Sequence, residues 1–296
     1  MKLILYILIL IIFAIFIFFL ESYRERRGFE ESHYIIKNKK LVNLKTDLKV
    51  VLLSDLHNKE YGNDNQKLID AIQNLKPNII FLAGDMLIGK TGEPTEIASK
   101  LIKSLTEIAP IYYGNGNHEQ RMKDFPEKYH EIYQEYKSEL VEKGVVFLEN
   151  QSTVITIQGQ KLRITGYEIP HEYYRHRSTK LLTVSEMHEA IGEQIGEYEI
   201  LLAHNPAHAK TYQKWGADLV LSGHLHGGIV RIPFLGGSIS PQIQLLPKYA
   251  GGHYTEKNTD IVVSRGLGEH TIKIRFLNKP ELIVLHMKKY CGDMEK

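Results

Sequence analysis

The chain opens with an unbroken apolar block at residues 3–20, which is followed at once by charged residues. As a helix this block would span about 27 Å, close to the roughly 30 Å hydrocarbon core of a bilayer. The block is apolar on every face, which argues against a core helix of a soluble domain. The pattern therefore predicts one transmembrane helix, with the anchor at residues 1–22.

A cleaved signal peptide is the nearest alternative for this block, since it also begins with an apolar segment. The block is followed by Glu-Ser-Tyr-Arg-Glu-Arg-Arg, without the small residues of a cleavage site, so an uncleaved single-pass anchor is favoured. Lys2 alone precedes it, whereas Arg24, Arg26, Arg27 and several lysines follow it. This asymmetry favours a cytoplasmic domain by the positive-inside rule, with the extracytoplasmic side left open.

From about residue 41 onward, short apolar runs alternate with polar, helix-like stretches, which is typical of an α/β domain. The predicted strands are 49–54, 78–83, 111–113, 153–157, 162–166, 199–203 and 218–222, with a further β-rich stretch at 261–274 and 282–286. The predicted helices are 65–75, 93–108, 119–143 and 184–195. Two sheets are expected from this order.

The expected domain organisation follows from these patterns. After the anchor, a charged juxtamembrane segment with a first strand is expected at 23–47, the folded domain at 48–290 and a tail at 291–296. The anchor is expected to lie outside the core and to be joined to the domain through the charged stretch 21–40. Deleting residues 1–24 is therefore expected to leave the activity nearly unchanged.

Five of the predicted strands stop at side chains that can bind a metal ion. These side chains are Asp55 and His57, Asp85, Asn117 and His118, His204, and His224 and His226. Ligands of open α/β sheets gather outside the carboxyl ends of the strands, so these five ends can converge on one site. Residues two apart on an extended segment also point the same way, which pairs Asp55 with His57 and His224 with His226.

Composition narrows the chemistry of this site. Lys and Arg number 37 against 35 Asp and Glu, so the net charge of +2 gives no support for a dedicated nucleic-acid binder. The chain has one cysteine, Cys291, which excludes an intrachain disulfide and a site built from several thiolates. Any metal must therefore be held by His, Asp, Glu or Asn, and the 14 histidines make such a site plausible.

A pair of divalent cations about 3.5 to 4 Å apart can neutralise charge and activate water in phosphoryl transfer. Such a pair needs a bridging ligand, and Asp85, which stands alone after a glycine, is the best candidate. Imidazoles suit manganese, iron or zinc. The complete candidate set is Asp55, His57, Asp85, Asn117, His204, His224 and His226.

These motifs carry a family resemblance. Asp55-Leu-His57, Gly84-Asp85, Gly116-Asn-His-Glu119, a histidine after a strand and Gly223-His-Leu-His226 occur in the order seen in the calcineurin-like metallophosphoesterase superfamily. The resemblance covers roughly residues 48–290. The glycine-rich segments that follow, including Ser264-Arg-Gly-Leu-Gly, are similar to the bacterial YkuE/YaeI-type subgroup, many members of which are membrane-associated.

The resemblance implies a four-layer α/β/β/α sandwich with a dimetal site at the top. It implies one metal held by Asp55, His57, Asp85 and His226, and a second held by Asp85, Asn117, His204 and His224. His118 would be the general acid. The implied enzyme is a metal-dependent phosphoesterase, and within that class a phosphodiesterase acting on a phosphodiester or pyrophosphate, with two divalent ions, manganese before iron or zinc.

Several alternatives stay open. A catalytically silent scaffold at the membrane is the competing function, and the substrate is either lipid-linked or soluble; no obligate protein partner is expected. His118 could instead anchor a loop, and Arg265 could either hold a phosphate or fix its glycine-rich loop. His253 and His270 are undecided. The segment 170–177 is either a lip for a substrate or membrane surface, or a solvated loop.

Overall fold

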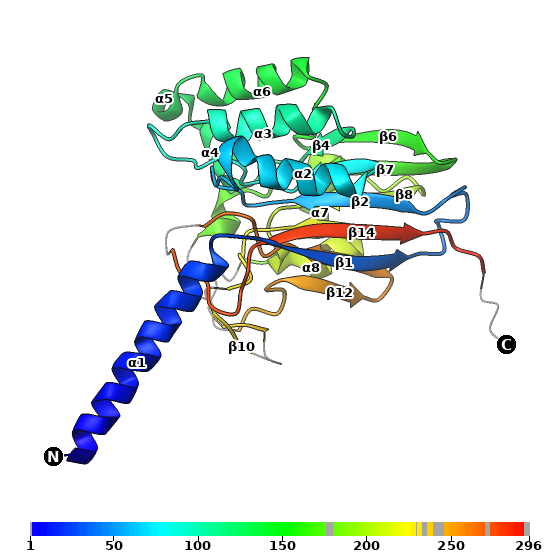
Figure 1. Cartoon of the computed structure of the whole chain (residues 1–296). Helices are drawn as coiled ribbons and strands as arrows, with labels where there is room; N and C mark the ends of the chain where they lie inside the picture. The colour runs from blue at the N-terminus through cyan, green and yellow to red at the C-terminus, as the bar shows by residue number, and fades with distance from the viewer. Residues whose placement is uncertain are drawn as a thin grey trace.

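The computed structural model describes residues 2–175, 180–228, 230–232, 236–238, 246–269 and 273–292. Two six-stranded sheets lie face to face, and helices cover the outer face of each sheet (Figure 1). Buried apolar side chains form three clusters, one between the two sheets and one between each sheet and its helices. The expected α/β/β/α sandwich is therefore confirmed.

The first sheet has the order β1-β14-β2-β3-β4-β5. Its strands are β1 Glu30–Lys37, β14 Glu281–Lys288, β2 Leu48–Leu53, β3 Ile79–Leu82, β4 Ile111–Tyr113 and β5 Val146–Phe147. The strands β2 to β5 are parallel, β14 is antiparallel to β2, and β1 pairs in parallel with β14. The central strands are buried along their length, which explains their continuous apolar sequences.

Helices α2 to α6 cover the first sheet. They are α2 Gln66–Leu75, α3 Glu96–Thr106, α4 Asn117–Asp124, α5 Pro126–Tyr129 and α6 Ile132–Glu142, with a 3₁₀ turn η1 at Asn63–Asn65. The expected single helix over 119–143 is wrong, because the chain breaks at Phe125 and again at His130. Pro126 lacks an amide proton and disfavours a helical conformation at Phe125.

The second sheet has the order β12-β13-β9-β8-β7-β6. Its strands are β12 Gly252–Glu256, β13 Thr259–Val263, β9 Leu219–Ser222, β8 Tyr198–Leu202, β7 Gln160–Gly166 and β6 Gln151–Ile157. Its cover is α7 Val184–Ile191 and α8 Ala209–Trp215, and the smaller elements are η2 His171–Tyr174, η3 Pro206–His208, β10 Arg231–Ile232 and β11 Gly236–Gly237. Helix α7 ends at Ile191, before Gly192 and earlier than expected.

The β-rich stretch expected over 261–274 is only partly correct. It contains the strand β13, but the described residues after Val263 form loops until β14. These loops lie over the carboxyl ends of the strands, where Gly268 donates its amide to the carbonyl of Asp55 at 2.6 Å. The segment therefore belongs to the site and adds no further strand.

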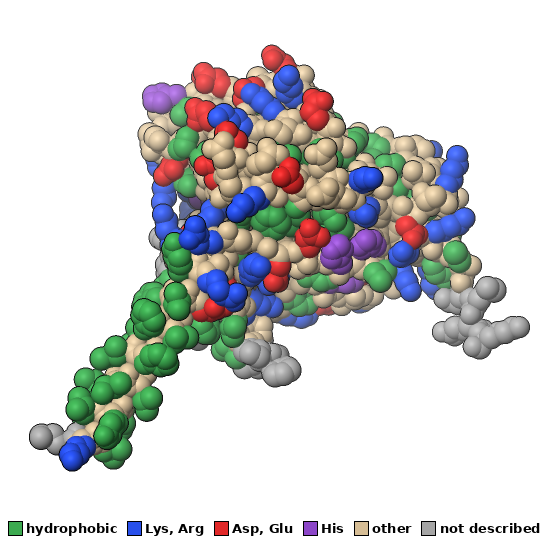
Figure 2. Space-filling model, viewed as in Figure 1, with side chains coloured by type: hydrophobic (Ala, Val, Ile, Leu, Met, Phe, Trp, Pro, Cys, Tyr) green, Lys and Arg blue, Asp and Glu red, His purple; other side chains and the backbone are tan. Residues whose placement is uncertain are grey.

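Helix α1, Lys2–Glu25, projects from the body of the protein, and its outer part is covered by apolar side chains on all visible sides (Figures 1 and 2). It is long and apolar enough to cross a membrane, and the window that fits is not buried against the rest of the chain. A membrane anchor and a signal sequence both meet this description.

The charged segment that joins the anchor to the domain is itself packed against that domain. Ser22 and Glu25 at the end of α1 are 2% and 7% exposed. The amide of Arg275 donates to Ser22 Oγ at 3.1 Å, and β1 is an edge strand of the first sheet. The end of α1 and the strand that follows it are therefore packed parts of the domain.

Candidate metal centre

The carboxyl ends of β2, β3, β4, β8 and β9 meet at one edge of the sandwich and bring the candidate ligands together. Three groups of side chains have possible ligand atoms within 4.8 Å of one another. These groups are Asp55, His57 and His226; His57, Asp85 and His118; and Asp85, His204 and His224. All of these residues except His224 are less than 9% exposed, and His224 is half-buried.

Two carboxylates stand at the centre of these groups. Oδ2 of Asp85 lies 3.1 Å from Nε2 of His204 and 3.9 Å from Nε2 of His57. Oδ1 of Asp55 lies 3.2 Å from Nε2 of His226, which is itself 3.1 Å from Nε2 of His57. Asp85 belongs to two of the three groups, which is the position that a bridging carboxylate requires.

The glycines of the motifs are explained by the close approach of these carboxylates. A Cβ at Gly116 would lie 2.2 Å from Oδ1 of Asp85, and a Cβ at Gly223 would lie 2.1 Å from Oδ2 of Asp55. Either methyl group would displace a carboxylate. The glycines of the Gly-Asn-His and Gly-His motifs are therefore needed for packing, in addition to the candidate ligands that follow them.

Backbone strain is concentrated at the candidate ligands. Asp55, His57, Asp85, His224 and His226 all have φ between +46° and +71°. Residues other than glycine seldom adopt this backbone conformation, and they keep it only where the surrounding structure holds them in place. The positive φ values therefore indicate that the fold fixes these side chains for a purpose other than stability.

The ring nitrogens of His57 and His204 are oriented for metal binding. Nδ1 of His57 lies 3.2 Å from the carbonyl oxygen of Leu87, and Nδ1 of His204 lies 2.6 Å from that of Ala83. A carbonyl can only accept, so the Nδ1 atoms carry protons and a neutral ring offers its Nε2 lone pair. Among the described residues, the buried Oδ1 of Asn117 also has no hydrogen-bond partner, which fits a metal ligand.

His118 has the opposite orientation. Its Nδ1 accepts a 2.7 Å hydrogen bond from the amide of Gly89, so the neutral ring carries its proton on Nε2. Nε2 lies 3.9 Å from Oδ2 of Asp85. A ring protonated at Nε2 can donate a proton there but cannot bind a cation with that atom, which separates His118 from His57 and His204.

The pKa shifts group the imidazoles differently, with His204 apart from His57, His118 and His224. Burial lowers the pKa of His57 well below its usual value and lowers that of His224 to about 3, so both rings are neutral and able to bind a metal. Burial also lowers the pKa of His118. At His204 burial is outweighed by the carboxylates of Asp85 and Asp55, which raise its pKa to about 10.

Glu119 is an organising residue to which the sequence analysis gave no role. Its Oε2 accepts from the amides of Asp85 at 2.8 Å and Gly116 at 3.1 Å, and its Oε1 accepts from the amide of Leu87 at 2.9 Å and the hydroxyl of Tyr113 at 3.0 Å. Glu119 is fully buried. Its position three residues after Gly116, at the start of α4, is the capping-box spacing and could have indicated this role.

Two further organising residues lie far away in sequence. Arg275 donates through Nη2 to the carbonyls of Arg265, Gly266 and Gly268. Asn278 donates through Nδ2 to the carbonyl of His226 at 2.8 Å. No local pattern could have revealed them, since both act on segments that approach only in the folded chain.

The remaining sequence expectations have mixed outcomes. Arg265 is paired with Glu281 at 2.9 Å and Glu30 at 2.5 Å, contacts that favour its loop-fixing role over phosphate binding. His253 lies 2.8 Å from Asp260 and away from the metal centre. His270 and residues 176–179 lie outside the described residues, whereas His171, Tyr174 and Arg175 line a pocket together with Asn117.

A cluster of buried Asp, His and Asn at the carboxyl ends of two stacked sheets defines the class of metal-dependent phosphoesterases. Residues 48–228 match the family described as calcineurin-like phosphoesterase. The chain belongs to this family and is a phosphoesterase, a hydrolase of phosphate esters. The family uses a dimetal centre, and the Asp and His clusters of this chain are able to bind metal.

The chain is also similar to individual proteins. The uncharacterized metallophosphoesterase YkuE of Bacillus subtilis is 28% identical over 90% of this chain and 88% of its own length. Phosphodiesterase YaeI of Escherichia coli is 27% identical over 81% of this chain and 82% of its own length. A solved structure, phosphopantetheinyl hydrolase of Mycobacterium tuberculosis, is 14% identical with a TM-score of 0.47, over 74% of this chain and 89% of that one.

Proposed function

We propose that the chain is a membrane-anchored, dimetal-dependent phosphodiesterase. The observation that carries the proposal is the contrast between the rings of His57 and His204, which offer Nε2 lone pairs, and the ring of His118, which offers an Nε2 proton. The Nε2 lone pairs of His57 and His204 suit cations, and the Nε2 proton of His118 suits a leaving oxygen. Both face the carboxylate of Asp85.

The first cation would be held by Asp55, His57, Asp85 and His226, and the second by Asp85, Asn117, His204 and His224. Two divalent cations, when bound, would polarise the phosphate and lower the pKa of a water molecule. Imidazole, carboxylate and amide oxygen together suit Mn²⁺, with Fe²⁺ and Zn²⁺ as alternatives. His224 is further fixed because its amide donates to Asp55 at 2.9 Å.

His118 would act as the general acid. The amide of Gly89 holds the ring in the tautomer with the proton on Nε2, and Asp85 draws that atom toward the centre. Donating this proton to the leaving oxygen lets the phosphorus–oxygen bond break without releasing an alkoxide. The neighbouring Glu119 holds the first turn of α4 and thereby the position of His118.

The proposed location is the membrane surface, with α1 as an uncleaved anchor and the catalytic domain on the cytoplasmic side. Lys and Arg side chains gather on the body where α1 emerges (Figure 2), which suits anionic headgroups. The metal centre lies at the same end of the sandwich as α1 (Figure 1). A lipid-linked phosphodiester or pyrophosphate is therefore the proposed substrate class.

A silent scaffold is the competing function. A scaffold has no need for five side chains held at positive φ around two carboxylates, nor for rings sorted by tautomer. These features favour the enzyme. The name of the relative YaeI, a phosphodiesterase, supports the same choice within the family.

The test uses the full-length protein in detergent micelles, stripped with a chelator and reconstituted with Mn²⁺. We expect two metal ions per chain by elemental analysis and hydrolysis of bis(p-nitrophenyl) phosphate, with both lost in an Asp55→Asn/Asp85→Asn double variant. Trace metal only, together with no turnover with Mn²⁺, Fe²⁺ or Zn²⁺, would leave the scaffold function.

A further inference from the structure

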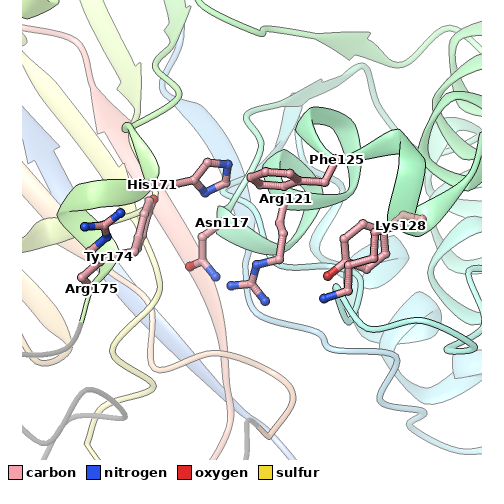
Figure 3. A pocket seen from close by; sticks show the side chains of 8 residues that line it. Asn117, Arg121, Phe125, Lys128, His171, Tyr174 and Arg175 are labelled. Atoms are coloured by element: carbon pink, nitrogen blue, oxygen red, sulfur yellow. The ribbon is translucent and has the colours of Figure 1, made fainter.

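A pocket of about 410 Å³ opens beside Asn117, between α4 and α5 on one side and η2 on the other (Figure 3). It is lined by Asn117, Arg121, Phe125, Lys128, Tyr129, His171, Tyr174 and Arg175. A volume of this size exceeds the needs of a single phosphate and lies in the usual range for small-molecule sites. Asn117 is shared with the candidate metal centre, so the pocket is a continuation of that site.

The charged side chains that line the pocket are all positive. Arg121, Lys128 and Arg175 contribute three positive charges, and none of the lining residues is acidic. Within the described part of the chain none of the three has a salt-bridge partner, although Lys128 lies over the ring of Tyr129 at 5.2 Å. Three like charges around one cavity repel one another, and an anion between them would relieve that repulsion.

The pocket lies on the side of the proposed leaving group. Arg121 follows His118 by three residues on α4, a spacing that places two side chains on neighbouring parts of one helix face. Arg121 therefore lies close to the residue that would protonate the leaving oxygen.

The wall of the pocket is aromatic as well as cationic. The rings of Phe125 and His171 lie next to each other along it, with centroids 5.5 Å apart and planes tilted by 40°, and Tyr174 lies on the η2 side (Figure 3). His171 is fixed by Asp124 at 3.0 Å. Such walls pack against the flat face of a base or sugar, which leaves the cations for a charged group.

We propose that this pocket binds a second phosphoryl group of the substrate through Arg121 and Lys128, so that the preferred substrate is a pyrophosphate diester. The inference rests on the proposed function. Water attacks the phosphorus at the metal centre, and the bond from that phosphorus to the bridging oxygen breaks. The bridging oxygen leaves with the second phosphoryl group and receives the proton of His118, and the products are two phosphate monoesters.

The first experiment compares substrates with full-length protein in micelles containing Mn²⁺. UDP-glucose represents a soluble pyrophosphate diester, CDP-dioleoylglycerol a lipid-linked one, and bis(p-nitrophenyl) phosphate a diester without a second phosphate. We expect kcat/KM for at least one pyrophosphate diester to exceed that for the nitrophenyl ester. The substrate with the higher kcat/KM, UDP-glucose or CDP-dioleoylglycerol, shows whether the preferred pyrophosphate diester is soluble or lipid-linked.

The variants are Arg121→Gln, Lys128→Gln and Arg121→Lys, with Lys143→Gln as the matched control on the exposed end of α6. Each glutamine variant should lower the ratio of kcat/KM for the pyrophosphate diester to kcat/KM for the nitrophenyl ester at least tenfold. The Arg121→Lys variant should give a ratio between those of the wild type and of Arg121→Gln, because lysine keeps the charge but loses the planar guanidinium group. The control should leave both values unchanged.

A second measurement separates the inference from the proposed function. Calorimetry in EDTA follows binding of the methylene-bridged diphosphonate analogue of UDP-glucose, and Arg121→Gln should weaken the wild-type affinity at least tenfold. This result would support the pocket even if no metal restored turnover. Turnover of the nitrophenyl ester with no preference for either pyrophosphate diester, equal losses on all substrates, or an unchanged analogue affinity would overturn the inference and leave the proposed function standing.

Discussion

The carboxylate of Glu25, at the end of α1, accepts a 2.8 Å hydrogen bond from the amide of Asn278. The side chain of Asn278 donates in turn to the carbonyl of His226, a candidate metal ligand. Arg26 adds an ion pair with Glu269 at 2.5 Å, in the loop that covers Asp55. The end of α1 is thus connected to the metal centre through two hydrogen bonds.

This connection changes what removal of the anchor should do. Deleting residues 1–20 should release the protein from membranes and keep its Mn²⁺ affinity, whereas deleting residues 1–28 also removes Ser22, Glu25 and Arg26 and should weaken both stability and Mn²⁺ affinity. Membrane sedimentation, the melting temperature and Mn²⁺ titration measure the three effects. Equal Mn²⁺ affinity of both truncations would restore the view of α1 as a passive anchor.

A point variant isolates the contact. Glu25→Leu leaves the buried amide of Asn278 without its acceptor, which should lower the free energy of unfolding by about 1–3 kcal/mol. Glu21→Leu is the control, because Glu21 pairs with Arg24 on the helix surface and such pairs contribute about 0–1 kcal/mol. A chemical denaturation series of both variants in detergent decides whether the two losses differ.

Asp85→Asn should be more damaging than His57→Gln, since a bridging group contacts both cations. We expect His57→Gln to retain about one metal ion and Asp85→Asn to retain less, with kcat/KM at least about tenfold lower in Asp85→Asn. Elemental analysis and kinetics on one preparation test both points. Equal metal loss in the two folded variants would count against Asp85 as the bridge.

His118→Asn should keep both metal ions, because Nε2 of His118 carries a proton and is not available as a ligand. The loss in kcat/KM should be small for a nitrophenyl ester and about 10²-fold or more for an alkyl phosphodiester, whose leaving oxygen needs a proton. Metal content and kcat/KM on both esters check the assignment. Loss of metal would make His118 a ligand, and equal losses on both esters would make it a positioning residue.

His208 should make the protein acid-sensitive. It is 5% exposed, and burial lowers its pKa to about 4 in the folded state, against about 6.5 in an unfolded chain. Between pH 6.5 and 4 the unfolded chain binds more protons, so the free energy of unfolding falls as the pH falls, by about 3 kcal/mol in total. The metal-free protein should lose this slope on His208→Gln. An identical pH dependence in wild type and variant would exclude His208 as its source.

Much of the fold was readable from local patterns. The buried strands β2, β3, β4, β8 and β9 were placed to within a residue, because a strand buried on both faces is a short apolar run with a polar stop. The sequence predicted one helix over 119–143 where the structure has three. The apolar periodicity continues through Phe125 and Pro126, although the helical backbone is interrupted there. The position of β1 at the edge of the first sheet and its pairing with β14 depend on residues some 250 positions apart.

The sequence by itself determined the kinds of atoms at the site: carboxylates, imidazoles and an amide at five strand ends, with no thiolate available. Only the tertiary structure decided what those atoms can do. The tautomers of His57 and His118 are set by Leu87 and Gly89, and the role of Arg265 by Glu281. Local sequence governs backbone conformation, but the protonation and the partners of a side chain depend on groups that approach only when the sheets stack. For the same reason the contacts of Ser22 and Glu25 with Arg275 and Asn278 could not be predicted from the sequence.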